Sequence, residues 1–396
     1  MWRYWPEHGL TNPCLAALPE SLARHALVRE AWAGLDPRKV WDMHVHLVGT
    51  GDSGSGIRLN PRMDSMANPM EYAQRLFYLN AGCVHDAPGR VDASYVERMH
   101  NLLDAMPQGV KLMLFAMDGV VEESGAENPG ATTILVPDSY ARDTARRHPQ
   151  YFEWVASIHP YRPDRIDRLE RAAAEGARAV KWLPSAMGMD PASQRCDRFY
   201  QALARLGLPL ITHAGRELAL GTASPQDLGN PLRLRRALEH GVRVVVAHCA
   251  SLGSDADLDR GANGPQVESF SLFERLMDEP RWEKTLFGDI SALTQVHRAV
   301  PGLRRVLERD HWHARLLNGS DYPLPGVMPV YSVERLAGLD LVDRAAAPVL
   351  KAVREHNPLL FDFVLKRSLR LNGRALPASV FETRGFFDQG STRRAS

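Results

Sequence analysis

Residues 40–47 read VWDMHVHL, and they form the first of eight short apolar runs that recur along the chain. The other seven are VKLMLFAM (110–117), EWVASI (153–158), ARAVKWL (177–183), LPLITH (208–213), VRVVVAH (242–248), KTLFGDI (284–290) and ARLLNGS (314–320). Stretches with helical periodicity separate the runs, which is the pattern of βα units around a parallel sheet. Eight such units without a break in composition predict an α/β fold, a single closed (β/α)8 TIM barrel.

The segments outside these runs are expected to decorate the barrel. Residues 1–39 contain a helical pattern at 19–34 and are predicted to form an N-terminal helical extension. An insertion between the first two strands, at about 48–109, has helical patterns around 69–80 and 92–106 and is predicted to cap the barrel mouth. The barrel domain then spans 40–371. Residues 372–396 are predicted to form a C-terminal tail, frayed over its last stretch, ETRGFFDQGSTRRAS.

The composition indicates an ordinary soluble globular protein: 396 residues, 44% hydrophobic and 24% charged, with 48 basic and 47 acidic side chains. A net charge of +1 offers no field to hold a polyanion, so neither nucleic acid nor a membrane surface is an expected partner. The expected partner is a small-molecule substrate, with assembly into a homodimer left open.

The four cysteines at 14, 83, 196 and 249 are too sparse for a disulfide scaffold and lack the short paired spacing of a structural zinc site. A reducing compartment fits this usage. The N-terminal stretch MWRYWPEHGLTNP lacks the continuous apolar core of a signal peptide, so the sequence predicts a cytoplasmic protein.

Active sites of parallel barrels form where the strands end, at the C-terminal rim. Of the fifteen histidines, this criterion keeps His44 and His46 on the first strand, His159 just after the third, His213 at the end of the fifth and His248 at the end of the sixth. It also keeps Lys181 on the fourth strand and Asp321 directly after the eighth.

His44 and His46 are two residues apart on a strand, so both imidazoles can face the barrel axis and together grip a metal ion. The alternative is a chance pair in a histidine-rich chain. A second pair, His311 and His313, has the same spacing but precedes the eighth strand. It should therefore lie at the bottom of the barrel, and we interpret it as part of the surface.

His213 and His248 each end an almost wholly apolar strand, where an unpaired imidazole is costly and a metal or hydrogen-bond partner is required. Asp321 follows a strand end in NGSDYP, where a buried carboxylate needs a cation or donors; its alternative is a helix cap or an Asx-turn before Pro323. A core histidine with a hydrogen-bond partner explains either histidine alone, but it explains the whole set less well.

Lys181 stands out because only six of the 48 basic residues are lysines. Three interpretations are open for it: a carboxylated lysine that bridges two metals, an amine that contacts substrate, or a rim lysine whose amine extends to solvent.

Taken in order, these residues resemble the amidohydrolase superfamily, in particular its metal-dependent amidohydrolase-related branch that includes aminocarboxymuconate-semialdehyde decarboxylase. The matching segments are WDMHVHL on the first strand, GARAVKWLP on the fourth, GLPLITHAG on the fifth, VRVVVAHCAS on the sixth, KTLFGDISA on the seventh, LLNGSDYP on the eighth and HNPLLFDF (356–363) in the C-terminal helix. The resemblance covers roughly residues 40–365.

The resemblance implies that His44, His46 and His213 bind a divalent metal, expected to be Zn²⁺, together with Asp321. His248 would be a second ligand or a catalytic base. Two-metal members use a carboxylated lysine on strand four as a bridge, which would be Lys181; one-metal members do without it, and one ion is favoured here over two.

The leading functional hypothesis is a hydrolase in which metal-activated water attacks an amide, ester or lactone bond. Asp321 would take the proton of the water and pass it to the leaving group, and His248 would stabilise the oxyanion or share a second metal. His159 and Arg216 are the candidates for substrate contact, Arg216 being alternatively a solvated loop charge.

Two other functions are kept as alternatives. The first is a non-oxidative decarboxylase of an aromatic or enol carboxylic acid. The second is a non-catalytic barrel that binds a ligand, which should have lost at least one ligand-type residue, whereas all five positions here are competent.

Overall fold

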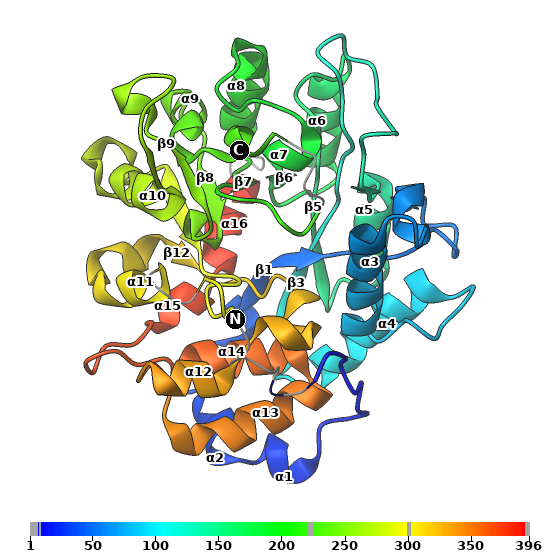
Figure 1. The fold of residues 1–396 in the computed structure, drawn as a ribbon, viewed down its shortest axis with the longest axis vertical. Helices are drawn as coiled ribbons and strands as arrows, with labels where there is room; N and C mark the ends of the chain where they lie inside the picture. The colour runs from blue at the N-terminus through cyan, green and yellow to red at the C-terminus, as the bar shows by residue number, and fades with distance from the viewer. Residues whose placement is uncertain (1–6, 8, 221–224, 299–301, 393–396) are drawn as a thin grey trace.

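Each of the eight apolar runs forms a strand of one parallel barrel in the computed structural model, which describes residues 7, 9–220, 225–298 and 302–392 (Figure 1). In spatial order the strands are β1 (Trp41–His46), β3 (Lys111–Phe115), β5 (Phe152–Val155), β6 (Val180–Trp182), β7 (Leu210–His213), β8 (Val244–Ala247), β11 (Leu286–Asp289) and β12 (Leu316–Leu317). Single parallel bridges close the ring, Ala156 to Val180 between β5 and β6, and Val45 to Tyr322 between the end of β12 and β1. The predicted (β/α)8 barrel is confirmed.

The strands form where apolar side chains can be buried on both faces of the sheet. The VVVA of β8 is buried throughout. One set of apolar side chains fills the barrel interior: Trp41, Met43, Met113, Phe115, Val155, Ala179, Ile211, Val245 and Leu317. A second, larger core lies between the strands and the surrounding helices.

Helices on the outside of the barrel connect the strands. They are α4 (Val91–Asp104), α5 (Asp138–Arg147), α6 (Arg165–Ala174), α8 (Asp197–Leu206), α9 (Arg235–Glu239), α10 (Ser269–Asp278) and α11 (Arg304–Glu308). After β12 the chain continues through α12 (Val333–Gly338), α13 (Ala347–His356) and α14 (Pro358–Ser368). The amide side chain of Asn357 caps the start of α14, accepting the N–H of Leu360, and the apolar PLLFDF segment buries that helix.

The N-terminal extension lies against these last helices (Figure 1). The helical pattern at 19–34 forms two short helices, α1 (Glu20–Ala23) and α2 (Ala26–Glu30), instead of one. The insertion after β1 contains β2 (Arg58–Leu59), α3 (Pro69–Ala81) and α4, close to the helical patterns read from the sequence. β2 pairs with β4 (Ile134–Leu135), and the other short elements are α7 (Pro184–Met187) and the hairpin of β9 (Ser254–Ala256) with β10 (Gln266–Glu268).

The C-terminal stretch that we expected to be frayed is helical. Its described part contains α16 (Arg384–Thr392), and α15 (Ala378–Phe381) directly precedes it; residues 393–396 lie outside the described part of the chain. The Trp41 carbonyl accepts a hydrogen bond from the Thr383 hydroxyl at 2.5 Å, and Phe387 joins the interior cluster with 2% exposure. The expectation was wrong because these residues close the apolar bottom of the barrel.

Cys14 and Cys83 form a disulfide that joins the N-terminal extension to the end of α3. The cysteine usage, which we interpreted as that of a reducing compartment, did not lead us to expect it. Cys196 and Cys249 are buried free thiols. Among the described helices, none combines the length and apolar character needed to cross a bilayer.

Candidate metal centre

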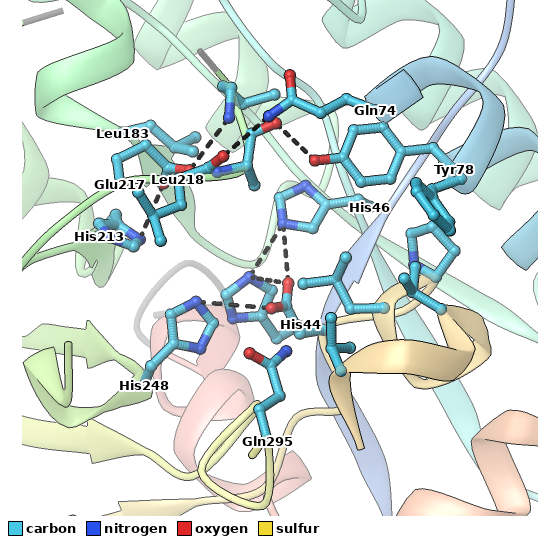
Figure 2. A pocket seen from close by; sticks show the side chains of 18 of the residues that line it. His44, His46, Gln74, Tyr78, Leu183, His213, Glu217, Leu218, His248 and Gln295 are labelled. Atoms are coloured by element: carbon cyan, nitrogen blue, oxygen red, sulfur yellow. Dashed lines mark hydrogen bonds and ion pairs between the residues drawn. The ribbon is translucent and has the colours of Figure 1, made fainter. Parts of the chain in front are cut away.

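Two imidazoles and one carboxylate converge at the C-terminal rim of the barrel (Figure 2). The Nε2 atoms of His44 and His46 are 3.1 Å apart, and Oδ1 of Asp321 lies 3.4 Å from the first and 3.3 Å from the second. All three donor atoms lie within 4.8 Å of one another. This is a donor set that a divalent transition metal accepts.

Gly319 allows the end of β12 to approach β1 closely at this point. A Cβ at residue 319 would lie 2.5 Å from the Cβ of His44, which no real contact tolerates. The backbone N–H of Asp321 then bonds the His44 carbonyl at 2.8 Å, so the carboxylate is set beside the histidine pair.

A buried network behind His44 fixes its ring. Nδ1 of His44 lies 2.6 Å from Oδ2 of Asp289, and both side chains are fully buried. The Ser291 hydroxyl bonds the same carboxylate oxygen at 2.5 Å. Burial lowers the pKa of His44 well below its usual value, so the ring is neutral, with its proton on Nδ1 and its Nε2 lone pair facing His46 and Asp321.

His248 follows β8 and approaches the same carboxylate. Its Nε2 is 3.7 Å from Oδ2 of Asp321, and its Nδ1 is 3.1 Å from the Ser291 carbonyl. A carbonyl only accepts, so Nδ1 carries the proton and Nε2 presents a lone pair; burial lowers the pKa of His248, keeping it neutral. This tautomer can accept a proton or bind a metal but cannot donate to an oxyanion, so the oxyanion role expected for His248 does not fit the geometry.

His248 and Asp321 also share an unusual backbone conformation. Their φ angles are 55° and 63°, in the left-handed region that residues other than glycine seldom adopt. Such conformations cluster at functional sites, where surrounding contacts hold them.

Lys181 points into the centre and not to solvent. It is 1% exposed, with Nζ 3.3 Å from Nε2 of His44 and 5.0 Å from the ring centre of Phe115. Burial lowers its pKa to about 8, against the opposing pull of nearby carboxylates. The interpretation as a rim lysine is therefore wrong, and the two functional interpretations remain.

His213 ends β7 and lies beside His248, their ring centres 5.5 Å apart. Its Nδ1 is 3.3 Å from Oε2 of Glu217. Its Nε2 is buried and has no hydrogen-bond partner in the described part of the chain. His213 is outside the tight group formed by His44, His46 and Asp321.

His159 and Arg216, our candidates for substrate contact, do not line the cavity above the centre. Nε2 of His159 bonds the Met187 carbonyl at 3.0 Å, and its Nδ1 accepts the N–H of Tyr161 at 3.1 Å, so both ring nitrogens are engaged. Arg216 is exposed. Both predictions of substrate contact are corrected: His159 is held by backbone partners, and Arg216 is the solvated loop charge of the alternative interpretation.

The second histidine pair precedes β12, away from the centre, as expected from its place in the sequence. His311 is exposed, but His313 is buried and its Nε2 bonds the Val306 carbonyl at 3.0 Å. The interpretation as surface is therefore wrong for His313.

A cavity of about 370 Å³ opens above the centre. Its walls are mostly apolar and include Phe77, Tyr78, Leu183, Leu218, Leu220 and Val330. Arg298 also lines it; this side chain is 7% exposed, donates from Nη1 to Ser251 at 3.3 Å, and has an Nε without a partner among the described residues. A buried guanidinium in an apolar wall is a ready partner for an anion.

Sequence reasoning missed three residues of this site. Asp289 is the last residue of β11, so the strand-end criterion that kept His213 applies to it as well. Glu217 stands four residues after His213 in ITHAGRE, a weak signal. Arg298 lies in the loop after β11 and carries no signal in a chain rich in arginine.

The residues present fit a divalent metal. His44 and His46 offer Nε2 lone pairs, Asp321 offers an oxygen, and His213 adds a buried nitrogen that has no partner among the residues that the structure describes. Asp289 and Glu217 lie behind His44 and His213, as the carboxylates behind metal-binding histidines do in general.

Several solved structures and one family model are similar to this chain. No curated protein matched the chain. A solved TIM-barrel protein of uncharacterized function from Bordetella bronchiseptica is 17% identical, with a TM-score of 0.46 over 79% of this chain and 98% of that one. A putative 2-pyrone-4,6-dicarboxylic acid hydrolase from Pseudomonas putida is 17% identical, with a TM-score of 0.45 over 82% and 97%.

A manganese-bound 5-carboxyvanillate decarboxylase from Novosphingobium aromaticivorans is 12% identical, with a TM-score of 0.44 over 81% and 96%. The family model described as Amidohydrolase matches residues 41–359, from β1 into α14. Since that match includes all eight strands of the barrel together with His44, His46 and Asp321, the chain belongs to the amidohydrolase family.

Proposed function

We propose that the protein is a metal-dependent hydrolase that cleaves an amide, ester or lactone bond in a small, largely apolar substrate bearing a carboxylate. The observation that carries the proposal is the position of the His44, His46 and Asp321 group at the base of an apolar cavity that also holds Arg298.

His44, His46 and Asp321 would hold the ion, with Nε2 of His213 as a further ligand. A divalent ion such as Zn²⁺, when bound, lowers the pKa of water and polarises a carbonyl. One ion is favoured over two. The second group of donors, His44, His248 and Asp289, is already bonded internally through Nδ1 of His44 and through Ser291.

We assign proton transfer to Asp321. Its Oδ1 faces His44 and His46, and its Oδ2 faces Nε2 of His248, 3.7 Å away. We assign it the task of accepting a proton from water and delivering it to the leaving group, with His248 as a second acceptor. Lys181 supplies the donor for a developing negative charge on the substrate oxygen, because its amine borders the same cavity.

Arg298 sets the substrate class. Its buried side chain provides a positive charge in a wall that is otherwise mostly apolar, so an uncharged substrate leaves its Nε without a partner. A carboxylate can bond the guanidinium through two oxygens. Arg298 thus takes the place that the sequence suggested for Arg216.

Decarboxylation of an aromatic acid is the second candidate function. It is favoured by the pairing of Arg298 with an apolar wall that contains Phe77 and Tyr78, which suits a flat ring with a carboxylate. In that case Asp321 or His248 handles the proton that replaces the lost carboxyl group.

The test is a substrate panel on Zn²⁺-loaded protein: esters, lactones and amides with and without a carboxylate, together with aromatic acids. Acid release and CO2 release are measured in parallel. We expect hydrolysis of carboxylate-bearing substrates and a KM raised about 10- to 100-fold in Arg298→Met, since a hydrogen bond to a charged group contributes about 1.5–3 kcal/mol. CO2 release without hydrolysis would transfer the assignment to the decarboxylase. A fully loaded protein inactive on the whole panel would contradict both.

A further inference from the structure

Residues 217–220, which we term the strap, follow β7 and form part of the cavity wall. Three side chains hold the strap from outside. Gln74 of α3 donates to the Leu218 carbonyl at 3.0 Å, and Tyr78 of α3 donates to the Ala219 carbonyl at 2.5 Å (Figure 2). Thr133 donates to the Leu220 carbonyl at 2.9 Å. The strap and α3 therefore form one wall of the cavity.

Glu217 holds the strap from inside. It is 4% exposed, and its Oε1 accepts the backbone N–H groups of Ala219 at 2.5 Å and Leu220 at 3.2 Å. The other oxygen, Oε2, lies 3.3 Å from Nδ1 of His213. One buried carboxylate thus bonds the strap and lies at ion-pair distance from His213.

This contact favours one of the two tautomers of His213. A carboxylate 3.3 Å away is an acceptor, so the proton is favoured on Nδ1 and Nε2 keeps its lone pair. That Nε2 is buried without a partner among the described residues. A free lone pair held in one tautomer is what a metal ligand requires.

We infer that Glu217 is a positioning residue that holds His213 in its metal-binding tautomer and ties this ring to the strap against which substrate packs. The inference rests on the proposed function, because it needs the metal centre. It has two separable consequences: the contact with His213 sets metal affinity, and the hydrogen bonds to the strap set substrate affinity.

Glu217→Gln separates the two consequences. The amide has the same size, and its oxygen can still accept from Ala219 and Leu220. Its NH2 group then faces Nδ1 and favours the opposite tautomer of His213. We expect Zn²⁺ affinity, measured by competition with a chromophoric chelator, to fall about 10- to 100-fold. The KM of the Zn²⁺-saturated variant should stay close to the wild-type value.

Thr133→Val is the matched control. It frees the Leu220 carbonyl without touching His213, so KM should rise while Zn²⁺ affinity stays unchanged. His213→Ala completes a double-mutant cycle: if Glu217 acts through His213, adding Glu217→Gln to His213→Ala causes no further loss of Zn²⁺ affinity. Nitrogen-15 NMR of the His213 ring, assigned by its loss in His213→Ala, should report the change of tautomer in Glu217→Gln.

Wild-type Zn²⁺ affinity in Glu217→Gln would overturn the inference, as would an equal loss in Thr133→Val or an additive loss in the cycle. If Glu217→Gln does not fold, Glu217→Asp replaces it. A shorter carboxylate that stays bonded to Ala219 and Leu220 lies farther from Nδ1 of His213, so Zn²⁺ affinity is again expected to fall. A wild-type protein that binds no Zn²⁺ would contradict the proposed function itself, so the two failures are distinguishable.

Discussion

His46 and His311 can be compared directly, because each belongs to a His-x-His motif of this chain. His46 lies against His44 and Asp321 with 18% of its side chain exposed, whereas His311 is 63% exposed. We expect His46→Ala to lose bound metal and turnover while its Tm stays close to that of the metal-free wild-type protein, and His311→Ala to keep metal and turnover. Elemental analysis and thermal unfolding measure this. Full metal occupancy in His46→Ala would refute the assignment of the centre.

Lys181 tests the number of ions. Its amine, 3.3 Å from Nε2 of His44 with a pKa of about 8, is not an anionic ligand unless it is carboxylated. We expect one ion per chain in the wild type and in Lys181→Ala. The variant should lose about 100- to 1,000-fold in kcat, the usual cost of removing a donor to a developing charge. Two ions in the wild type, one in the variant, and rescue by short carboxylic acids would instead show a carboxylated bridge.

The helix α5 contains a titrating group that makes stability depend on pH. Asp138 is its first residue, and its Oδ1 accepts the Ser157 N–H at 2.8 Å. Burial, with a smaller effect from Asp118, raises the pKa of Asp138 from 3.8 to about 7. Between these values the folded protein keeps a proton that the unfolded chain releases. The contribution of Asp138 to the free energy of unfolding therefore falls as pH rises through this window, by up to about 1.4 kcal/mol per pH unit.

Asp138→Asn keeps an acceptor for Ser157 and removes the titration. We expect urea unfolding between pH 4.5 and 7 to show a less negative slope of stability against pH in the variant than in the wild type. Parallel curves for the two proteins would contradict this account of Asp138.

A disulfide lies just beyond the end of helix α3. Cys83 follows α3 and is bonded to Cys14, 69 residues away in sequence, while Phe77 and Tyr78 of α3 line the cavity. Replacing both cysteines by serine should lower stability by about 2–4 kcal/mol and raise KM more than it lowers kcat. Adding reductant to the variant controls for Cys196 and Cys249 and should change nothing further. An unchanged KM would show that α3 is held without the disulfide.

At the scale of the whole molecule, the metal centre lies where the first and the last strand of the barrel meet. Asp321 follows the last strand and His44 and His46 lie on the first, where the two strands meet through the bridge of Val45 and Tyr322. An ion bound to all three ligands should therefore stabilise the closed barrel. At a free Zn²⁺ concentration 100 times Kd the gain is about 2.7 kcal/mol. We expect Tm to rise with Zn²⁺ and to fall back with chelator, and neither shift to occur in His46→Ala.

The sequence by itself determined the barrel and the residues at its rim. Strands buried on both faces must be continuous apolar runs, and helices between them must show a period near 3.6, so both could be located from composition and spacing. The alternation of side chains along a strand placed His44 and His46 on one side, and the strand ends located Lys181, His213 and His248. These inferences need only local geometry and the one rule that parallel strands end at the same rim.

Only the tertiary structure decided which polar groups meet. Arg298, and not Arg216, borders the cavity, and His159 turns to backbone partners, because loop conformations depend on packing between distant segments. The same holds for Asp289 behind His44 and for the C-terminal helix α16 beneath the barrel. The end of a strand determines the position of a residue on the barrel rim, but not the groups that its side chain contacts. Its partners come from segments many residues away, and the energy of a buried contact is fixed by that long-range arrangement and not by the local pattern.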